Sequence, residues 1–328
     1  MAGMLLAASA GCASTTAAHP PTSEHPAPAP TAEPEPALVA PPAPALGGSC
    51  ESVIDDATLS GLVGAPVVRQ TAEGSERVLT VAVLGGLDCA WVDESGEAYI
   101  WLDVMPVAGL EERAARAEED SPYCYGGDVP ENRCTFSAVV GGYWFSGIVG
   151  VAAGSGRSSV DVIDALSARL AGTAAGAPAV AVTRPDGMWG AELDCASFGS
   201  TVDTAEILGS PFAAETGNFG GEVTPGFIGA LDEVGDVSCI WSTGDARWFT
   251  SEVLPGAGWA ITELGARDGA ASVTVDGALA AVALSPGGDV TNIYATDGVN
   301  LAWVSAPAEI DRAASVALLS ELMAAASR

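Results

Sequence analysis

Carboxylates are the acid–base groups that this sequence offers in number. It contains 42 Asp and Glu residues against 12 basic residues, and all the basic residues are Arg. The two His residues, His19 and His25, stand in a Pro-rich stretch that composition predicts to be unfolded. The absence of Lys excludes a phosphate-binding P-loop, a Schiff-base lysine and an S-x-x-K hydrolase. The positions of the two His residues exclude Ser-His, Cys-His and His-metal sites in the folded part.

A pair of Asp or Glu side chains is therefore the strongest hypothesis for an enzyme, as in glycosidases. Asp103 and Glu252 are candidates, although acids are abundant enough for a chance pair and both read as solvated strand residues. The acidic loop D-E-V-G-D at Asp232 lacks the D-x-[DN]-x-[DN]-G spacing of a calcium loop, and G-S-G at Gly154 is not a nucleophile elbow. We therefore expect no catalytic residue, metal or cofactor, and keep a secreted carboxylate-dependent hydrolase as the alternative.

Tryptophans are the better candidates for binding. Trp101, Trp248 and Trp259 lie on or beside the segment that follows each C-x-W motif, where a strand face or a cleft edge presents an indole to a sugar or a peptide. The alternative is that they are ordinary core residues, because Trp is usually well buried. We expect Trp91 and Trp241, inside the C-x-W motifs, to lie in the core.

The formal net charge of −30 narrows the possible partners. An acidic chain without a basic cluster repels nucleic acid and anionic lipid, so neither is an expected partner. The 48% of hydrophobic residues exclude disorder of the whole chain, and the 328 residues suggest about two domains. An interaction module whose acidic surface docks a basic partner is a further alternative.

Two copies of one pattern follow each other in the chain. The stretch C-E-S-V-I-D-D-A-T-L-S-G-L-V-G-A-P-V begins at Cys50 and aligns with C-A-S-F-G-S-T-V-D-T-A-E-I-L-G-S-P-F, which begins at Cys195. A C-x-W motif follows at Cys89 and at Cys239, and V-M-P-V-A-G from Val104 later matches V-L-P-G-A-G. Both copies close with apolar residues at helical spacing. Landmarks in the same order indicate an internal duplication.

Each copy reads as a mixture of helices and mostly antiparallel strands. A short helix is predicted from Asp55 or Asp56 to Leu62, because Gly64 and Pro66 would end it. The charged run L-E-E-R-A-A-R-A-E-E-D predicts a solvated surface helix. The segments that read as strands in the first copy are 78–84, 89–92 and 99–104.

The uncharged stretch 135–156 is long enough to cross a bilayer. Six glycines interrupt it, and its counterpart 293–305 contains Asp297 and Asn300. We therefore predict a buried hairpin in each copy, with a transmembrane span as the alternative. The expected fold is α+β: two tandem, disulfide-stapled, mostly antiparallel sheets, each with helices packed on one face.

The internal repeat predicts how the cysteines pair. If Cys12 carries lipid, six cysteines remain, an even number in a chain that reads as exported. The duplication makes the pairs Cys50–Cys89 and Cys195–Cys239 equivalent and leaves Cys124 to Cys134. The alternative is a metal site of four thiolates, but no C-x-x-C spacing is present.

Residues 1–12 read as a lipoprotein signal peptide. A small, apolar run leads into S-A-G-C, which places Cys12 where a lipobox has its acylated cysteine. Ser9 departs from the usual Leu, and no basic residue precedes the run, so we expect translation to start upstream of Met1. The alternative is an Ala-rich disordered end with an unmodified cysteine.

Composition divides the rest of the chain into a stalk and two repeats. Residues 13–46 are dominated by Pro, Ala, Thr and Ser, which predicts an extended, disordered linker that lifts the body from a membrane by about 3 Å per residue. The repeats are expected at 47–172 and 179–328, joined by the small-residue linker T-A-A-G-A-P at 173–178.

The C…L-G…C-x-W arrangement behind a lipobox and stalk resembles small cell-envelope lipoproteins of high-GC Gram-positive bacteria, a large set of unknown function. It is more distantly similar to the extracytoplasmic sensor domains of actinobacterial serine/threonine kinases, whose α+β fold is stapled by two disulfides around a cleft. The resemblance implies envelope location and binding of a ligand or partner, and it transfers no catalytic residue. We therefore predict a non-catalytic binding protein on the extracytoplasmic face, with membrane contact through its lipid anchor only.

Overall fold

Capped short helices open each copy of the repeat. In the computed structural model, the Asp55 carboxylate accepts the Thr58 N–H and caps α2 (Asp56–Val63), and Gly64 ends the helix with a φ of 78°. This agrees with the helix predicted from the sequence, because only glycine adopts such a φ without strain. The structure describes residues 37–70, 76–125, 132–190, 192–217, 223–244, 247–285 and 290–328.

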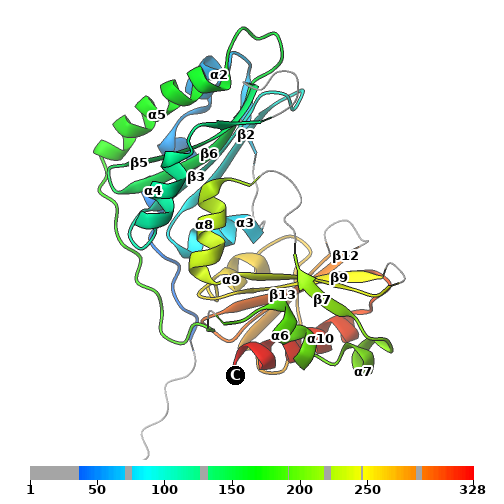
Figure 1. Cartoon of the computed structure of the whole chain (residues 1–328). Helices are drawn as coiled ribbons and strands as arrows, with labels where there is room; N and C mark the ends of the chain where they lie inside the picture. The colour runs from blue at the N-terminus through cyan, green and yellow to red at the C-terminus, as the bar shows by residue number, and fades with distance from the viewer. Residues whose placement is uncertain are drawn as a thin grey trace, which may run out of the picture. The chain divides into compact units, whose positions relative to one another are not determined.

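The first copy builds a six-stranded antiparallel sheet in the order β1-β2-β3-β6-β5-β4 (Figure 1). Its strands are β1 (Val67–Gln70), β2 (Leu87–Asp93), β3 (Tyr99–Pro106), β4 (Tyr123–Cys124), β5 (Arg133–Val140) and β6 (Tyr143–Gly150). Its helices, besides α2 and the 3-10 turn η1 (Ala45–Gly47), are α1 (Cys50–Val53), α3 (Glu76–Val83), α4 (Glu111–Glu119) and α5 (Ser159–Ala175).

The second copy builds a seven-stranded sheet in the order β10-β11-β12-β13-β9-β8-β7, which repeats the first order with one added edge strand. Its strands are β7 (Ala213–Thr216), β8 (Val237–Ser242), β9 (Trp248–Leu254), β10 (Ala271–Ser272), β11 (Ala280–Leu284), β12 (Val290–Thr296) and β13 (Leu301–Pro307). Its helices are α6 (Cys195–Thr201), α7 (Thr204–Leu208), α8 (Pro225–Val234), α9 (Ala260–Gly265) and α10 (Arg312–Ala326). The α+β fold with two antiparallel sheets is thus as the sequence predicts.

The predicted hairpins and disulfides are confirmed. Strands β5 and β6 pair across the Gly141-Gly142 turn, and β12 and β13 pair across the turn that contains Asp297 and Gly298. Within the described part of the chain, no helix has the length and apolar character to cross a membrane. The disulfides join Cys50 to Cys89, Cys124 to Cys134, and Cys195 to Cys239.

One predicted strand is wrong. Residues 78–84 belong mainly to helix α3 and not to a strand. The run V-L-T-V-A-V-L is rich in β-branched residues, which favours a strand when it is considered alone. Leu79, Val81 and Val83, at every second position, are all buried in the helix, and apolar residues at that spacing are also typical of a strand. Tertiary burial overrides the local propensity here.

Helices cover both faces of the two sheets, and not one face alone as the sequence predicted, because the copies pack against each other. On one face of the first sheet lie α2 and α5, as Figure 1 shows, and on one face of the second lies α10. The other faces share one hydrophobic cluster, in which Met105 and Trp144 of the first sheet join Leu254 and Trp303 of the second. Helices α3, α4, α8 and α9, which we call the inner helices, contribute to this cluster.

Two irregular segments pack against both copies. Residues 37–46, which we call the strap, donate the Ala45 N–H to Gly85 of the first copy and the Val39 N–H to Gly298 of the second. Composition assigned these residues to the disordered stalk, but Leu46 lies in the first hydrophobic core. The segment 177–190 after α5 runs beside the strap. Residues Pro36–Arg328 accordingly form one compact unit.

Candidate functional site at the junction of the two copies

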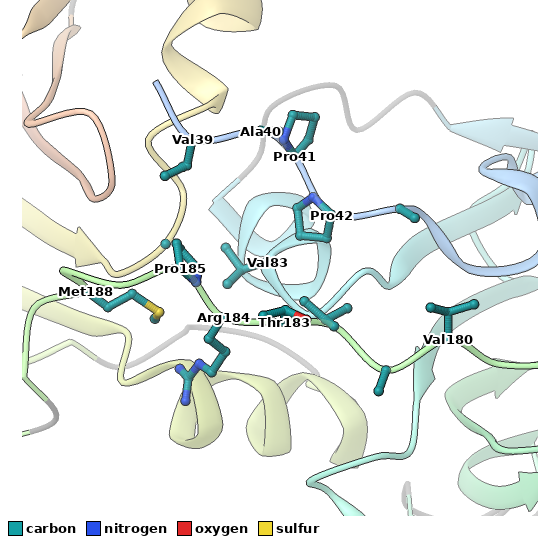
Figure 2. Close-up of a pocket in the computed structure, with 14 residues that line it drawn as sticks. Val39, Ala40, Pro41, Pro42, Val83, Val180, Thr183, Arg184, Pro185 and Met188 are labelled. Carbon is teal, nitrogen blue, oxygen red and sulfur yellow. The ribbon is translucent and has the colours of Figure 1, made fainter. Parts of the chain in front are cut away.

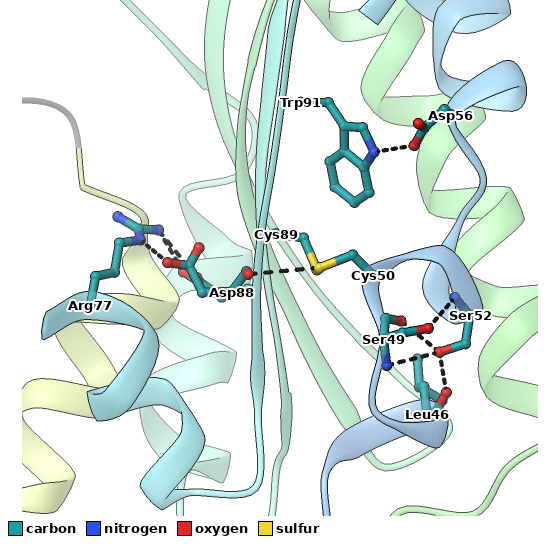
Figure 3. Close-up of a disulfide and its surroundings, with 10 residues drawn as sticks. Leu46, Ser49, Cys50, Ser52, Asp56, Arg77, Asp88, Cys89 and Trp91 are labelled. Atoms are coloured by element: carbon teal, nitrogen blue, oxygen red, sulfur yellow. Dashed lines mark hydrogen bonds and ion pairs between the residues drawn. A yellow bond between two sulfur atoms is a disulfide. The ribbon is translucent and has the colours of Figure 1, made fainter. Parts of the chain in front are cut away.

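A half-buried guanidinium joins the two copies. Arg77, on α3, donates its Nε to Asp88 Oδ2 at 3.0 Å, and its Nη2 lies 3.1 Å from both Asp103 carboxylate oxygens. Figure 3 shows Arg77 facing Asp88 on one side of β2, while Cys89 faces Cys50 on the other, as alternation along a strand requires. The same Nη2 lies 3.1 Å from Thr224 Oγ1, which belongs to the second copy. A first-copy cation is thus shared across the junction.

The cluster holds two carboxylates against one cation. Asp88 and Asp103 are opposite each other on β2 and β3, so their repulsion adds to the effect of burial. Burial and the neighbouring Asp103 raise the pKa of Asp88 to about 7, although Arg77 opposes the shift. The Thr224 hydroxyl donates to Asp103 and accepts the Phe227 N–H at the start of α8. Asp103 therefore holds both the cation and the first turn of a second-copy helix.

Helix α8 packs closely on the first sheet. The Gly226 N–H donates to Ser146 Oγ at 2.7 Å. A Cβ added at Gly229 would lie 2.7 Å from the Trp144 ring, so only glycine fits there. At the outer edge, Arg113 of α4 pairs with Asp232 of α8 at 2.6 Å. We call this arrangement of α8 and α4 the closed side of the junction.

The equivalent place at the second copy is open. Here α3 and α9 border a cavity of about 770 Å³, within the size range of small-molecule sites. Trp259 closes one wall, and its buried indole nitrogen has no hydrogen-bond partner among the residues that the structure describes. We call this the open side. The cavity is lined by Pro41, Pro42, Pro44, Val78, Leu79, Ala82, Gly86, Leu87, Asp88, Trp259, Glu263, Ala266 and Arg267.

One strand position explains the difference between the two sides. Ser146 of β6 pairs with Asp103 of β3, and Trp303 of β13 pairs with Glu252 of β9, so Ser146 and Trp303 occupy equivalent places. The small serine lets the backbone at Gly226 approach the first sheet, whereas the buried indole of Trp303 fills that space on the second. The strap and α9 instead form the walls of the resulting gap.

A second groove lies between the strap and segment 177–190. Figure 2 shows Val39 and Pro42 of the strap on one side and Val180, Arg184 and Met188 on the other. This groove measures about 340 Å³. Arg184 donates to the Val234 carbonyl at 3.1 Å and so binds the end of α8. The segment 177–190 therefore runs along the junction in contact with α8, and the predicted linker 173–178 begins inside α5, which ends at Ala175.

The structure separates the three candidate tryptophans. Trp259 lines the junction cavity, and the half-buried Trp101 lies with its ring centre 5.8 Å from the Arg77 guanidinium. Trp248 lies in a different groove, on the second copy, and is 52% exposed. Cys12, the predicted lipidation site, lies outside the described residues. Trp91 and Trp241 are fully buried.

The predicted solvation of the candidate carboxylates is wrong. Asp103 and Glu252 are buried, because the inner helices cover the strand faces that a single copy would expose to water. Asp232, predicted in an acidic loop, lies in α8 and pairs with Arg113. Among the described residues, no group of three or more His, Cys, Asp or Glu side chains is arranged to hold a metal ion.

Sequence reasoning missed Arg77, Thr224 and the two helix glycines. Arg77 and Phe227 each stand twelve residues before the strand cysteine of their copy, and the guanidinium lies 4.8 Å from the Phe227 ring centre. The repeat alignment could have found this pair of equivalent positions. The spacing of Gly226 and Gly229, three apart on a helix, could have indicated a close approach to a neighbouring element.

Comparison with known proteins adds no relative. No protein-family model, curated protein or solved structure matches this chain.

Proposed function

We propose that this protein is a lipid-anchored binding protein of the cell envelope, without catalytic activity, and that the junction cavity on the open side holds its ligand. The observation that carries the proposal is the cavity itself, which lies between two copies whose equivalent surfaces meet on the closed side. A duplicated body that leaves one of two equivalent places open has a preformed space for another molecule.

The lining of the cavity suggests the class of ligand. Its walls are mostly apolar, from prolines of the strap and from Val78, Leu79 and Leu87. Arg267 stands at this cavity half-buried, and no ion pair of its side chain is found among the described residues. An apolar molecule that carries one acidic group, such as an acyl chain with its carboxylate, fits both features.

The anchor is the second part of the proposal. The lipobox-like S-A-G-C sequence and the Pro-rich stretch after it support acylation at Cys12 and an extracytoplasmic location. Mass spectrometry of the mature protein from its native host would detect the acyl chains on Cys12. Cys12→Ala should move the protein from the membrane fraction to the soluble fraction, and recovery of an unmodified Cys12 in soluble protein would remove the anchor from the proposal.

Binding is tested with a fluorescent fatty acid, cis-parinaric acid, titrated into the full-length protein. We expect saturable binding that Ala266→Phe weakens by about tenfold or more, because the added ring occupies the cavity. Ala115→Phe on α4 is the matched control, an exposed alanine on the equivalent helix of the first copy, and should leave binding unchanged. Equal affinities for the two variants would exclude the cavity as the site.

A further inference from the structure

A second surface, which shares no lining residue with the junction cavity, has features of a docking site. Trp248 begins β9 and is 52% exposed, an unusual state for so large an apolar side chain. It lies in a groove of about 480 Å³ between α7, the start of α10 and the end of β13. We call it the Trp248 groove. Its lining residues are Ile207, Leu208, Phe212, Arg247, Trp248, Pro307, Glu309, Ile310, Asp311 and Ala314.

An acidic trough of about 680 Å³ continues from the groove between α7 and α10. The two share Ile207, Asp311 and Ala314, so they form one continuous surface. Among the described residues that line the trough, none is basic, and its carboxylates come from Asp203, Glu206, Asp276, Asp311 and Glu321.

Not all of these carboxylates are available to a partner. Asp203 accepts the Glu206 N–H and Asp311 accepts the Ala314 N–H, so both cap helices. Glu206, Asp276 and Glu321 are exposed and cap no helix. The trough therefore presents three carboxylates beside an apolar groove, and a partner that binds them takes no helix cap away from the fold.

The first copy lacks this surface because its aromatic residue is covered. Tyr99 occupies the place of Trp248, since each pairs with the residue three positions after the strand cysteine. Tyr99 is only 8% exposed, and its ring lies against Gly150, where a Cβ would come within 2.3 Å of it. The Arg133 guanidinium lies 5.6 Å from the centre of the same ring. Exposure of the aromatic residue is thus specific to the second copy.

We propose that the Trp248 groove and the acidic trough together bind a basic polypeptide segment in which apolar and cationic side chains alternate. An apolar side chain of the segment would lie on Trp248 and Ile310, and its neighbouring Arg or Lys side chains would reach the trough. Charge complementarity selects this occupant, because three exposed carboxylates favour cations and Trp binds cations over its face. Arg247 is already bound to Ser210 at 3.0 Å and lies over Phe212. The proposal does not depend on the ligand of the junction cavity.

The test is calorimetric titration of the full-length protein with a short synthetic peptide in which Arg and Leu alternate. Trp248→Ala should weaken binding by about tenfold or more, the loss that follows truncation of an aromatic anchor, while Trp248→Tyr should recover part of it. Because Trp248 is half exposed, both variants are expected to fold, and circular dichroism checks this.

Charge is tested separately from shape. Replacing Glu206, Asp276 and Glu321 by their amides should weaken binding about tenfold and reduce its salt dependence. The matched control replaces three exposed acids of the first copy, Glu94, Glu97 and Glu119, and should have little effect although the net charge changes equally. The proposal is overturned if the control triple variant weakens binding as much, if Trp248→Ala binds unchanged, or if a peptide with Gln in place of Arg binds equally well.

Discussion

The closed and open sides of the junction are built from equivalent elements, but a helix packs on the sheet on the closed side and a cavity remains on the open side. On the closed side, α8 of the second copy lies on the first sheet, with the Gly226 N–H on Ser146 and Arg113 paired with Asp232. On the open side, α3 and α9 leave a cavity of about 770 Å³ that the strap borders. Helix α8 of the second copy has Gly229 at the contact, and the equivalent position on helix α3 of the first copy is Leu79.

A duplicated chain can thus leave a cavity at one of two equivalent places without adding new elements. Two equal surfaces related by duplication would bury each other on both sides. Ser146 on one sheet and Trp303 on the other decide which helix can approach closely. Stability is concentrated where the approach is close, and space remains where it is blocked, in line with the tight packing of protein interiors. The following changes test that division, in order of decreasing expected effect.

Arg77→Leu should lower the free energy of unfolding by about 3–5 kcal/mol, because Asp88 and Asp103 lose their shared cation in a buried place. Urea denaturation measures the loss. Arg267→Leu, on the open side, is the control and should change stability by no more than about 0.5 kcal/mol. Adding Asp88→Asn and Asp103→Asn to Arg77→Leu should recover part of the loss. Similar stabilities for the two arginine variants would contradict a role of this cluster in holding the closed side.

Gly229→Ala should cost about 1–3 kcal/mol, since its Cβ would lie 2.7 Å from the Trp144 ring and force α8 away from the first sheet. Gly61→Ala is the matched control, in helix α2 with no atom within 4 Å of the added Cβ. It should stabilise the protein by about 0.5–1 kcal/mol through helix propensity alone. Thermal unfolding of both variants compares them, and a neutral Gly229→Ala would mean that the closed side is not tightly packed.

Stability should fall as the pH rises through about 7, the raised pKa of Asp88. The folded protein holds a proton on Asp88 that the unfolded chain releases near pH 3.8, so this contribution is complete at low pH and is lost on deprotonation. The loss between about pH 6 and pH 8 is on the order of 1 kcal/mol. Asp88→Asn should flatten the profile, and an unchanged slope in that variant would assign it to another group.

Trp259→Phe and Trp144→Phe remove the same atoms from the two sides. Trp144 Nε1 donates to Ser137 at 2.7 Å, whereas Trp259 Nε1 is buried and has no partner in the described part of the chain. The closed-side variant should therefore be the less stable of the two by about 1 kcal/mol, the value of one buried hydrogen bond. Urea denaturation of the pair gives the difference directly. The reverse order would show that the open-side indole has an acceptor that this structure does not contain.

Local patterns predicted much of the fold. The Asp55 cap, the hairpin turns at Gly141-Gly142 and Gly298, and the three disulfides follow from short-range signals and from the repeat. The segment 78–84 was misread because its β-branched residues favour a strand locally, while the burial that accompanies the helix depends on contacts between the copies, which are distant in sequence. The burial of Asp103 was missed for the same reason, since it depends on α8, which is distant in sequence.

The first capped helix, the two hairpins, the pairing of cysteines and the acidic charge could all be predicted from the sequence, because they depend on local geometry and on a pattern repeated along the chain. Three features depend on the packing of the folded chain: a guanidinium from one copy meets a helix start from the other, one side of the junction closes, and Trp248 remains exposed while Tyr99 is covered. These outcomes depend on which side chains occupy the same space, and residues far apart in the chain compete for it.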